Sequence, residues 1–166
     1  MQAQRAFTLI EMFIVLTLLS ILGHIAVPAL QDFLERNRQQ ALHDQVTRAI
    51  ANARMYAVTQ RVQVELCGSS DGLTCDDNWA QGWLLRPFKH SEPISVTQLN
   101  GDRPRLQWSG FQQRIRFHSS GISPTGNGRF YSCYKQRITW QLVLNRQGRL
   151  RTASPAENTA QTARCT

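Results

Sequence analysis

The feature that most constrains this chain is a run of twenty residues, 12–31, that contains no Asp, Glu, Lys or Arg. A helix of about 20 apolar residues is long enough to cross the roughly 30 Å hydrocarbon core of a membrane. The alternatives are a buried core helix and a cleaved secretory signal, for which the sequence AVPAL near the end of the run offers a cleavage site. Core helices seldom extend this far without charge, and signal cores usually span about 7–15 residues. We therefore expect a membrane helix that the mature protein retains.

The charges that flank this run predict which side of the membrane each end occupies. Only Arg5 and the amino terminus carry positive charge before it, and positively charged segments tend to stay in the cytoplasm. The short amino-terminal tail is therefore expected in the cytoplasm, and everything after residue 31 is expected to be exported.

Helical periodicity continues beyond the apolar run. Apolar residues recur at the spacing of one helix face from Leu30 through Val46 to Tyr56, with charged residues between them. No turn cluster separates this amphipathic segment from the apolar run, so one continuous helix is expected from about residue 8 to residue 58. Pro28 lies inside it and is expected to kink or locally open it.

From residue 60 the apolar period changes to two, which is typical of strands. Strand candidates are the segments 61–67, 82–88, 94–99, 105–108, 115–118 and 130–133. The clearest hairpin covers 138–154, where the turn Arg146-Gln147-Gly148 joins two alternating arms and Gly148 can take a positive φ. We therefore predict an α+β fold in which the long helix packs its apolar stripe on an antiparallel sheet. Four tryptophans are expected to pack in or around the core: Trp79, Trp83, Trp108 and Trp140.

Four cysteines in an exported chain predict two disulfides, for which three pairings are possible. We favour Cys67–Cys75, which would close a polar loop, together with Cys133–Cys165, which would hold the carboxyl tail. A zinc site is the alternative use of these residues. Neither spacing is the tight Cys-x-x-Cys of common zinc modules, so no metal is predicted.

The net charge of +8 is concentrated in the last part of the chain. Residues 1–100 hold 8 basic and 9 acidic side chains, whereas residues 101–166 hold 11 basic and 2 acidic ones, and ten of those eleven are arginine. A solvated basic surface is one explanation. The other is a phosphate-binding surface, because the planar guanidinium forks onto phosphate oxygens better than a lysine ammonium does.

The amino-terminal segment AFTLIEMFIVLTLLSILGHIAVPAL resembles that of type IV pilins. The resemblance implies a leader of residues 1–6, which a prepilin peptidase removes between Ala6 and Phe7, followed by methylation of the new Phe7 amine. Ala6 stands where the family pattern has Gly. The resemblance also implies that Glu11 pairs with the amino-terminal amine of an adjoining subunit during assembly. Such a pair would offset the cost of a carboxylate in lipid, about 2.5–3.5 kcal/mol on insertion scales.

The remainder resembles a narrower group, the minor pilins of the GspH/FimT/FimU kind, and most of all FimT. The segments that carry this resemblance are ERNRQQAL at 35–42, ANARMYAVTQRVQVELC at 51–67, and the stretch from DGLTC to NWAQGWLL at 71–85. FimT-type proteins act in DNA uptake and carry a carboxyl-terminal Gly-Arg-x-Arg motif, which here is Gly148-Arg149-Leu150-Arg151.

The spacing of this motif fits a phosphate contact. In a strand, Arg149 and Arg151 would project on one side, about 6.6–7 Å apart, which is close to the spacing of neighbouring phosphates along a DNA strand. Gly148 would set the turn that presents them. Arg146 in the same turn and Arg164 near the last cysteine would add to this DNA-binding surface. The alternative is a pair of solvated strand arginines without a ligand.

These observations lead to one expected function and one alternative. The first is a minor pilin whose head, residues 31–166, binds double-stranded DNA without sequence preference and contributes to DNA uptake in natural transformation. Residues 7–30 would form the membrane and assembly segment. The alternative is a structural minor pilin or pseudopilin that primes or adapts pilus assembly for twitching motility or secretion.

The expected partners follow from the same resemblance. They are the prepilin peptidase, the inner membrane before assembly, and other major and minor pilins in the pilus at the cell surface. No nucleophile–base pair, phosphate loop or histidine metal spacing occurs in the sequence, so neither an enzyme nor a cofactor is predicted.

Overall fold

The computed structural model describes residues 8–99 and 106–165. The chain divides into two compact units, Met1–Arg38 and Gln39–Thr166. The boundary therefore falls inside the long helix, a little beyond residue 31, where the sequence placed the start of the head. The predicted cleavage site between Ala6 and Phe7 lies outside the described residues.

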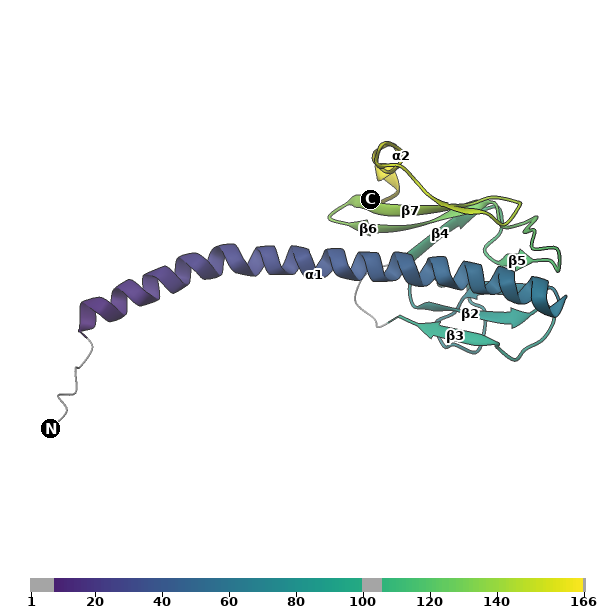
Figure 1. Cartoon of the computed structure of the whole chain (residues 1–166), viewed down its shortest axis with the longest axis horizontal. Coiled ribbons are helices and arrows are strands. Elements are labelled where there is room, and N and C mark those ends of the chain that lie inside the picture. The colour runs from purple at the N-terminus through teal and green to yellow at the C-terminus, as the bar shows by residue number, and fades with distance from the viewer. Residues whose placement is uncertain (1–7, 100–105, 166) are drawn as a thin grey trace. The chain divides into compact units, whose positions relative to one another are not determined.

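Helix α1 covers Leu9–Gln60 and continues through Pro28, close to the predicted limits of 8 and 58 (Figure 1). At its start, the Thr8 hydroxyl accepts a hydrogen bond from the Glu11 N–H at 3.3 Å and so caps the helix. The large apolar side chains of the first unit are exposed, from 75% at Leu9 to 44% at Leu34. By length and composition, α1 is the one helix among the described residues that is apolar enough to cross a membrane.

Two polar side chains in this apolar part are satisfied within the helix itself. The Thr17 hydroxyl donates to the Phe13 carbonyl at 2.6 Å, and Nδ1 of His24 lies 2.8 Å from the Ser20 carbonyl oxygen. Such bonds to the preceding turn give a polar side chain a partner where no water is present. Each residue therefore has one polar partner inside the helix, and the second ring nitrogen of His24 is not part of this bond.

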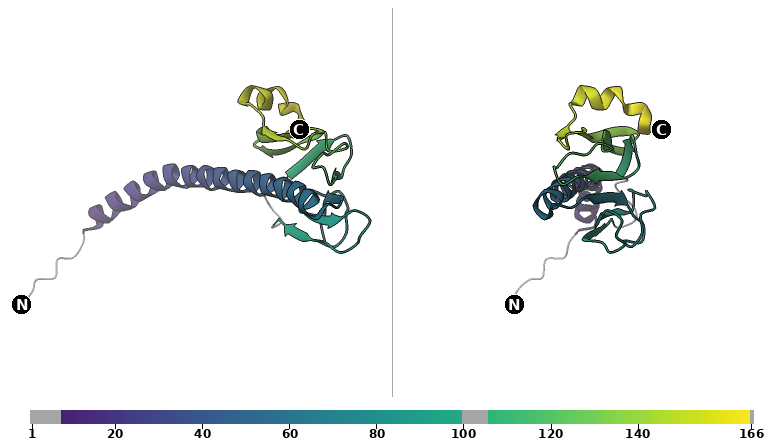
Figure 2. Two further views of the ribbon diagram at one scale, coloured as in Figure 1. Left: turned by 45° about the vertical axis from the view of Figure 1, so that its right-hand side comes forward. Right: turned by 90° about the vertical axis from the view of Figure 1, so that its right-hand side faces the viewer.

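The second unit contains two four-stranded antiparallel sheets (Figures 1 and 2). Sheet A has the strand order β3 (Ser95–Gln98), β2 (Gly82–Pro87), β1 (Val64–Gly68), β5 (Ile115–Phe117). Sheet B has the order β4 (Leu106–Gly110), β6 (Gly128–Tyr134), β7 (Arg137–Leu144), β8 (Leu150–Thr152). The predicted α+β fold is confirmed, with the strands divided between two sheets rather than gathered in one. The division arises because β5 returns to pair with β1, whereas β4 pairs with β6.

One hydrophobic core joins the carboxyl-terminal part of α1 to both sheets. The helix contributes five side chains that recur on one face and are at most 3% exposed: Leu42, Val46, Ile50, Ala53 and Ala57. Sheet A contributes Val64, Leu66, Leu85, Ile115 and Phe117, and sheet B contributes Leu106, Phe130, Leu142 and Leu144. All four tryptophans belong to this core, which confirms their predicted structural role.

On the outer face of sheet A, Glu65 is 3% exposed and lies among three arginines. Its carboxylate accepts hydrogen bonds from Arg86 at 2.9 Å and from Arg116 at 2.8 Å, and Nη1 of Arg114 lies 3.7 Å away. Burial acts to raise the pKa of this carboxyl, but the hydrogen bonds from Arg116 and Arg86 outweigh it, so the pKa lies below its ordinary value. Glu65 therefore stays ionised and offsets the mutual repulsion of the three guanidiniums.

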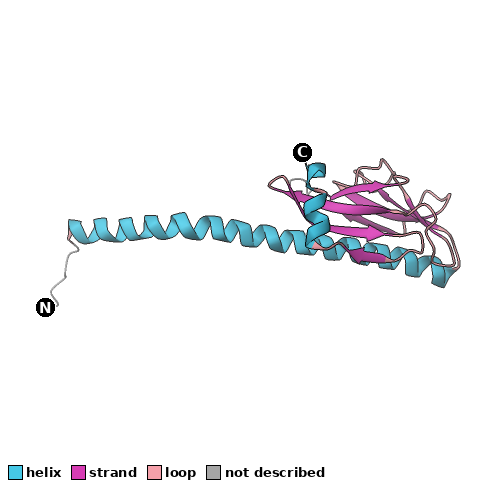
Figure 3. Cartoon of the chain, turned by 90° about the horizontal axis from the view of Figure 1, so that it is seen from above, coloured by secondary structure: helices cyan, strands magenta, loops and turns pink. Residues whose placement is uncertain are grey.

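The chain ends in two short helices that the sequence analysis did not predict, α2 (Pro155–Ala160) and η1 (Thr162–Cys165). A capping box starts α2: the Ser154 hydroxyl accepts from the Glu157 N–H, and the Glu157 carboxylate accepts from the Ser154 N–H. Helix α2 packs over β7, where Gln141 donates to the Glu157 carbonyl at 3.3 Å and to the Asn158 side chain at 3.0 Å (Figure 3).

The Glu65 cluster gives a prediction for stability. Glu65→Gln should lower the free energy of unfolding by about 2–3 kcal/mol, which is less than a fully buried ion pair because the arginines keep some exposure to water. Since its pKa is lowered on folding, the contribution of Glu65 is present above its ordinary value near 4.5 and is lost as the pH falls through the lower folded value.

The measurement is urea unfolding of the full-length chain in detergent, followed by tryptophan fluorescence at pH 7 and at acid pH. Glu92→Gln is the matched control, because Glu92 is exposed in a loop near sheet A. If Glu65→Gln and Glu92→Gln lower the free energy of unfolding equally, Glu65 does not have the stabilising role described above.

Candidate nucleic-acid interface

The turn between β7 and β8 is fixed by its own backbone. The Gly148 N–H donates to the Asn145 carbonyl at 3.0 Å, and the Arg149 N–H donates to the Asn145 side chain at 2.9 Å. Gly148 has a φ of +72°, and a Cβ there would lie 2.5 Å from the Gly121 carbonyl oxygen. The turn therefore requires glycine at this position, both for its φ and for the close approach.

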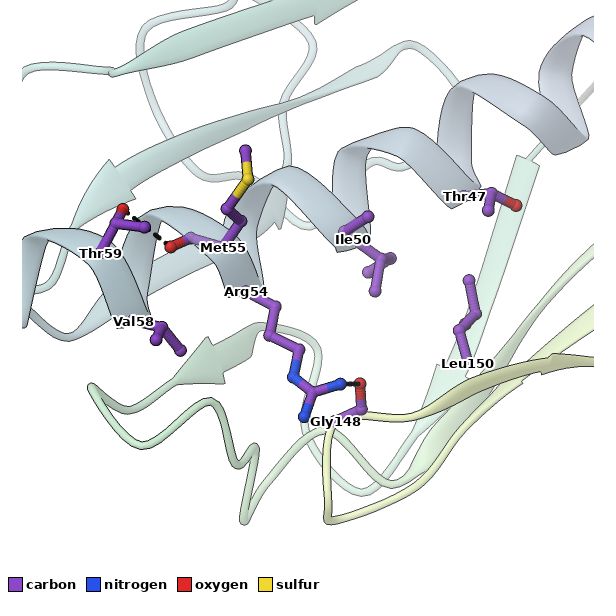
Figure 4. Close-up of a pocket in the computed structure, with 9 residues that line it drawn as sticks. Thr47, Ile50, Arg54, Met55, Val58, Thr59, Gly148 and Leu150 are labelled. Atoms are coloured by element: carbon purple, nitrogen blue, oxygen red, sulfur yellow. Dashed lines mark hydrogen bonds between the residues drawn. The ribbon is translucent and has the colours of Figure 1, made fainter.

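Arg54 ties this turn to α1. Its Nη1 donates to the Gly148 carbonyl at 3.3 Å across the end of an open groove of about 460 Å³. Figure 4 shows the groove between α1 and β8, with Ile50 and Leu150 on its two walls and Met55 at its edge. The side chain of Arg54 is thus used to position the hairpin.

The residues of the Gly-Arg-x-Arg motif alternate between two sides of the hairpin. Leu150 lines the groove beside α1, and Oγ1 of Thr152 lies 3.3 Å from Nε2 of His43 on α1. Arg151, between them on β8, is 57% exposed. Arg149 comes one residue before the strand and is exposed as well. The alternation places Arg151 on the side of sheet B that faces away from α1. The Arg149 carbonyl accepts the Asn145 N–H at 3.1 Å and so continues the same ladder, which is consistent with Arg149 on that side as well.

The register of sheet B adds a third arginine to this outer face. Arg151 pairs with Val143, Val143 pairs with Arg129, and Arg129 pairs with Ser109. Residues paired in this way point to the same face of an antiparallel sheet. The row crosses three strand intervals, about 14 Å in all. Arg129 is half-buried, and its Nη1 donates to the Gln141 side chain at 3.3 Å.

Arg164 reaches the same face from the carboxyl tail. The disulfide Cys133–Cys165 joins η1 to β6, and from η1 the Arg164 guanidinium donates to the Ser109 hydroxyl at 2.9 Å. Its Cζ also lies 6.0 Å from the centre of the Tyr131 ring, within the range of a cation–π contact.

Four arginines therefore lie on one side of sheet B, and we call them the arginine face: Arg129, Arg149, Arg151 and Arg164. Arg146 is exposed in the adjoining turn. Among the described residues, no hydrogen bond or ion pair holds the side chains of Arg146 and Arg149. These two guanidiniums are open to an external anion.

Arg151, by contrast, already holds a carboxylate. Its Nη1 and Nη2 donate to the two oxygens of Glu157 at 2.9 and 2.8 Å, which is the bidentate fork geometry. The hydrogen bond from Arg151, aided by the Ser154 N–H, lowers the pKa of Glu157 to about 2. The same pair raises the pKa of Arg151. Both groups are therefore charged throughout the physiological range of pH.

The remaining cysteines form the second disulfide, Cys67–Cys75, beneath the loop that covers the outer face of sheet A. Both pairings in the structure are those that the sequence favoured. Glu65, Cys67 and Cys75 place potential ligand atoms within 4.8 Å of one another. Because the two sulfurs are bonded to each other, neither is available as the thiolate that zinc requires.

The structure thus places Arg149, Arg151 and Arg164 of the predicted surface on one face of sheet B, with Arg164 bonded to β4 at the opposite edge from Arg151 and with Arg146 in the turn before Arg149. Glu11, the predicted assembly residue, lies in the first unit and is exposed. The sequence analysis missed Arg129 and Glu157. Only strand register places Arg129 on this face, whereas the spacing Ser154-Pro155-Ala156-Glu157 was a readable capping-box signal for Glu157.

Two family models match this chain, one at its amino terminus and one in its head. Residues 43–148 match the family described as "Type II transport protein GspH", and residues 1–27 match the "Prokaryotic N-terminal methylation motif". The "Prepilin peptidase-dependent protein D" of Escherichia coli K12 is 38% identical over 78 residues, and this match spans 46% of each chain.

Among solved structures, the type IV minor pilin FimU of Pseudomonas aeruginosa PAO1 is similar in two crystal forms. In space group P21 it has a TM-score of 0.60 and 17% identity, over 75% of this chain and 94% of that chain. In space group P65 the TM-score is 0.55 at 15% identity, over 70% and 94%. At these identities the likeness concerns the fold.

The disulfide that holds η1 gives a prediction. Replacing Cys133 and Cys165 by serine should lower the free energy of unfolding by about 3–4 kcal/mol, because the bond closes a loop over 32 residues. The same change at Cys67 and Cys75, which are 8 residues apart, should cost about 2–3 kcal/mol. Urea unfolding of the two double variants in detergent compares them.

A local measurement accompanies the global one. Without Cys133–Cys165, trypsin should cut after Arg164 faster than in the parent chain, because η1 is no longer held against β6. An unchanged cleavage rate would show that packing alone keeps the tail in place.

Proposed function

The chain is a type IV minor pilin of the GspH/FimT/FimU family, and from this premise we propose that it binds double-stranded DNA and contributes to DNA uptake in natural transformation. This family consists of structural pilins. The methylation motif and the apolar part of α1 fit a protein that is anchored in the inner membrane with a periplasmic head and is then assembled into a pilus. DNA would be an additional partner, bound by the arginine face.

The observation that carries the proposal is the one-sided charge of the sequence around sheet B. Residues 106–165 hold nine basic side chains and a single acidic one, Glu157. Two of the nine, Arg114 and Arg116, lie beside Glu65 on sheet A and do not add to the charge of sheet B. Four of the nine are the arginine face, on the side of sheet B that the core does not use. Guanidinium groups form bidentate hydrogen bonds to phosphate oxygens, and Arg149 has no competing partner among the described residues.

The form of the surface favours binding without sequence preference. A protein that reads the DNA sequence usually inserts a helix or a β-ribbon into the major groove. The helices beside the arginine face in the described region are α2, which has six residues and an acidic first turn, and the four-residue η1, and both are too short to act as reading helices. The arginines would therefore contact the phosphate backbone, and the affinity should fall steeply with salt because counterions are released on binding.

Processing and assembly belong to the same proposal. The prepilin peptidase would remove residues 1–6 after Ala6, and the Phe7 amine would then be methylated. Glu11, at the start of the apolar helix, would pair with the amino-terminal amine of a neighbouring pilin and so avoid the cost of an unpaired carboxylate in lipid. The match of residues 1–27 to the methylation motif supports this order of events.

A structural role in pilus assembly is the second candidate function. It is favoured by the likeness of the fold to FimU and by the open apolar groove between α1 and β8. In this case the positive charge would serve contacts to other pilins. A deletion strain separates the two: loss of DNA uptake with intact pili supports the first function, and loss of pili supports the second.

For DNA binding, the double variant Arg149→Gln/Arg151→Gln should weaken the affinity about ten-fold at low salt. It should also reduce the slope of log K against log salt by about 1.8, since each lost phosphate contact removes about 0.9. The measurement is fluorescence anisotropy of a labelled duplex with the full-length chain in detergent, over a series of salt concentrations.

The matched control is Arg48→Gln/Lys89→Gln, which removes the same charge from the side of the head that carries sheet A. Arg48 is exposed on α1, and Lys89 follows β2. Unchanged binding by the arginine variant, or an equal loss in the control, would eliminate the arginine face as the DNA site.

For processing, protein purified from a host with a prepilin peptidase should begin at Phe7 and carry one amino-terminal methyl group by mass spectrometry. Ala6→Gly restores the family pattern and should be processed at least as completely. A mature chain that begins beyond Pro28 would mean that the apolar run is a cleaved signal and would contradict the membrane anchor.

A further inference from the structure

We infer that Glu157 is a built-in competitor for the phosphate site: it occupies the Arg151 guanidinium in the free protein and is displaced when a DNA phosphate binds. The inference rests on the proposed function and names how that same site is regulated. A carboxylate presents two oxygens to the fork of an arginine in the same way as a phosphate does. The geometry at Arg151, with two parallel bonds of 2.9 and 2.8 Å, is therefore that of an occupied anion site.

The pair is exposed enough to exchange. The side chains of Arg151 and Glu157 are 57% and 43% exposed, so water and an incoming anion both reach them. Exposed ion pairs of this kind contribute little free energy. Glu157 can therefore lose its place to a phosphate that also contacts Arg149, which lies two residues away on the same side.

Glu157 also stays close to Arg151 after its carboxylate has been displaced. Its backbone forms the first turn of α2, and its carboxylate accepts the Ser154 N–H at 2.8 Å as part of the capping box. Gln141 and the disulfide Cys133–Cys165 keep α2 and η1 on sheet B. The displaced carboxylate thus stays beside Arg151 and rebinds when the phosphate leaves, because a tethered group competes at a high effective concentration.

Glu157 competes with phosphate at one member of the arginine face, Arg151. Glu157 is the single acidic residue among residues 106–165. Arg149 has no carboxylate partner in the described part of the chain, and the side chain of Arg129 bonds to the neutral Gln141. Arg149 is therefore available to the first phosphate, and Arg151 joins only after exchange.

The test removes the negative charge of Glu157 and retains the capping box of α2. Glu157→Gln should raise the affinity for a duplex about three- to five-fold at low salt, the size of effect expected from one exposed ion pair. Glutamine also fits the third position of a capping box, so α2 should remain folded. The measurement is the same anisotropy titration with the full-length chain in detergent, together with thermal unfolding to verify the fold.

Two backgrounds separate competition from simple charge repulsion. Introduced into Arg151→Gln, the change Glu157→Gln should have almost no effect, because the guanidinium for which Glu157 competes is gone. Introduced into Arg149→Gln, it should still raise the affinity three- to five-fold. Glu92→Gln serves as the control for removal of an unrelated acidic charge and should leave the affinity unchanged.

Equal gains in the two backgrounds, or no gain from Glu157→Gln in the parent chain, would overturn the inference and leave the proposed function standing. If the parent chain binds the duplex but none of the arginine changes weakens it, the arginine face and the competitor both fall. If the parent chain binds no DNA at all, the proposed function falls with them.

Discussion

The two sheets of the head share one buried surface, the apolar stripe of α1 from Leu42 to Ala57. Sheet A packs against it with side chains such as Leu66 and Phe117, and sheet B does so with side chains such as Phe130 and Leu142. Without the helix, each sheet would leave an apolar face in water, which small antiparallel sheets cannot tolerate. Burial of this stripe thus decides which face of each sheet points outward.

The outer faces of the two sheets carry the charged side chains, and the two faces differ in how their arginines are paired. On sheet A, three arginines converge on the buried Glu65, so their charge is used inside the protein. On sheet B, the exposed carboxylate of Glu157 pairs with Arg151 alone among the four arginines. Both faces hold arginines, but each of the three on sheet A has a carboxylate partner, Glu65 or Asp77. Sheet B carries the larger excess of positive charge, and Arg149 there has no such partner among the described residues.

The sequence predicted a large part of this arrangement because the signals for it are local. The apolar period identified α1 to within two residues at each end, and the alternating arms around Gly148 identified the β7–β8 hairpin. The division of the strands into two sheets was not predictable in this way. It depends on β5 returning to β1 across more than forty residues, and nothing in either segment specifies its partner.

The same distinction between local and non-local signals applies to the residues of the candidate site. Arg149 and Arg151 could be found from the motif and its spacing, whereas Arg129 joins them only through the register of β6 with β7. Glu157 had a local signal, the capping box, but its contact with Arg151 depends on how α2 packs on sheet B. The motif arginines of the surface could thus be predicted from the sequence, whereas the place of Arg129 and the pairing of Arg151 with Glu157 could not.

The roles proposed for Glu11 and Glu157 illustrate how the surrounding solvent would decide the role of an acid beside a cation. In the proposed assembly, Glu11 would enter lipid, where an unpaired charge costs up to about 2.5–3.5 kcal/mol at the centre of a membrane helix. The proposed pair with a neighbouring amine would therefore be expected to persist. At the surface of the head, the pair of Glu157 with Arg151 is worth about 0–1 kcal/mol, so it can be replaced by any anion that offers slightly more. Under these proposals, one kind of interaction would suit both permanent assembly and reversible capture, and the dielectric around it would select between them.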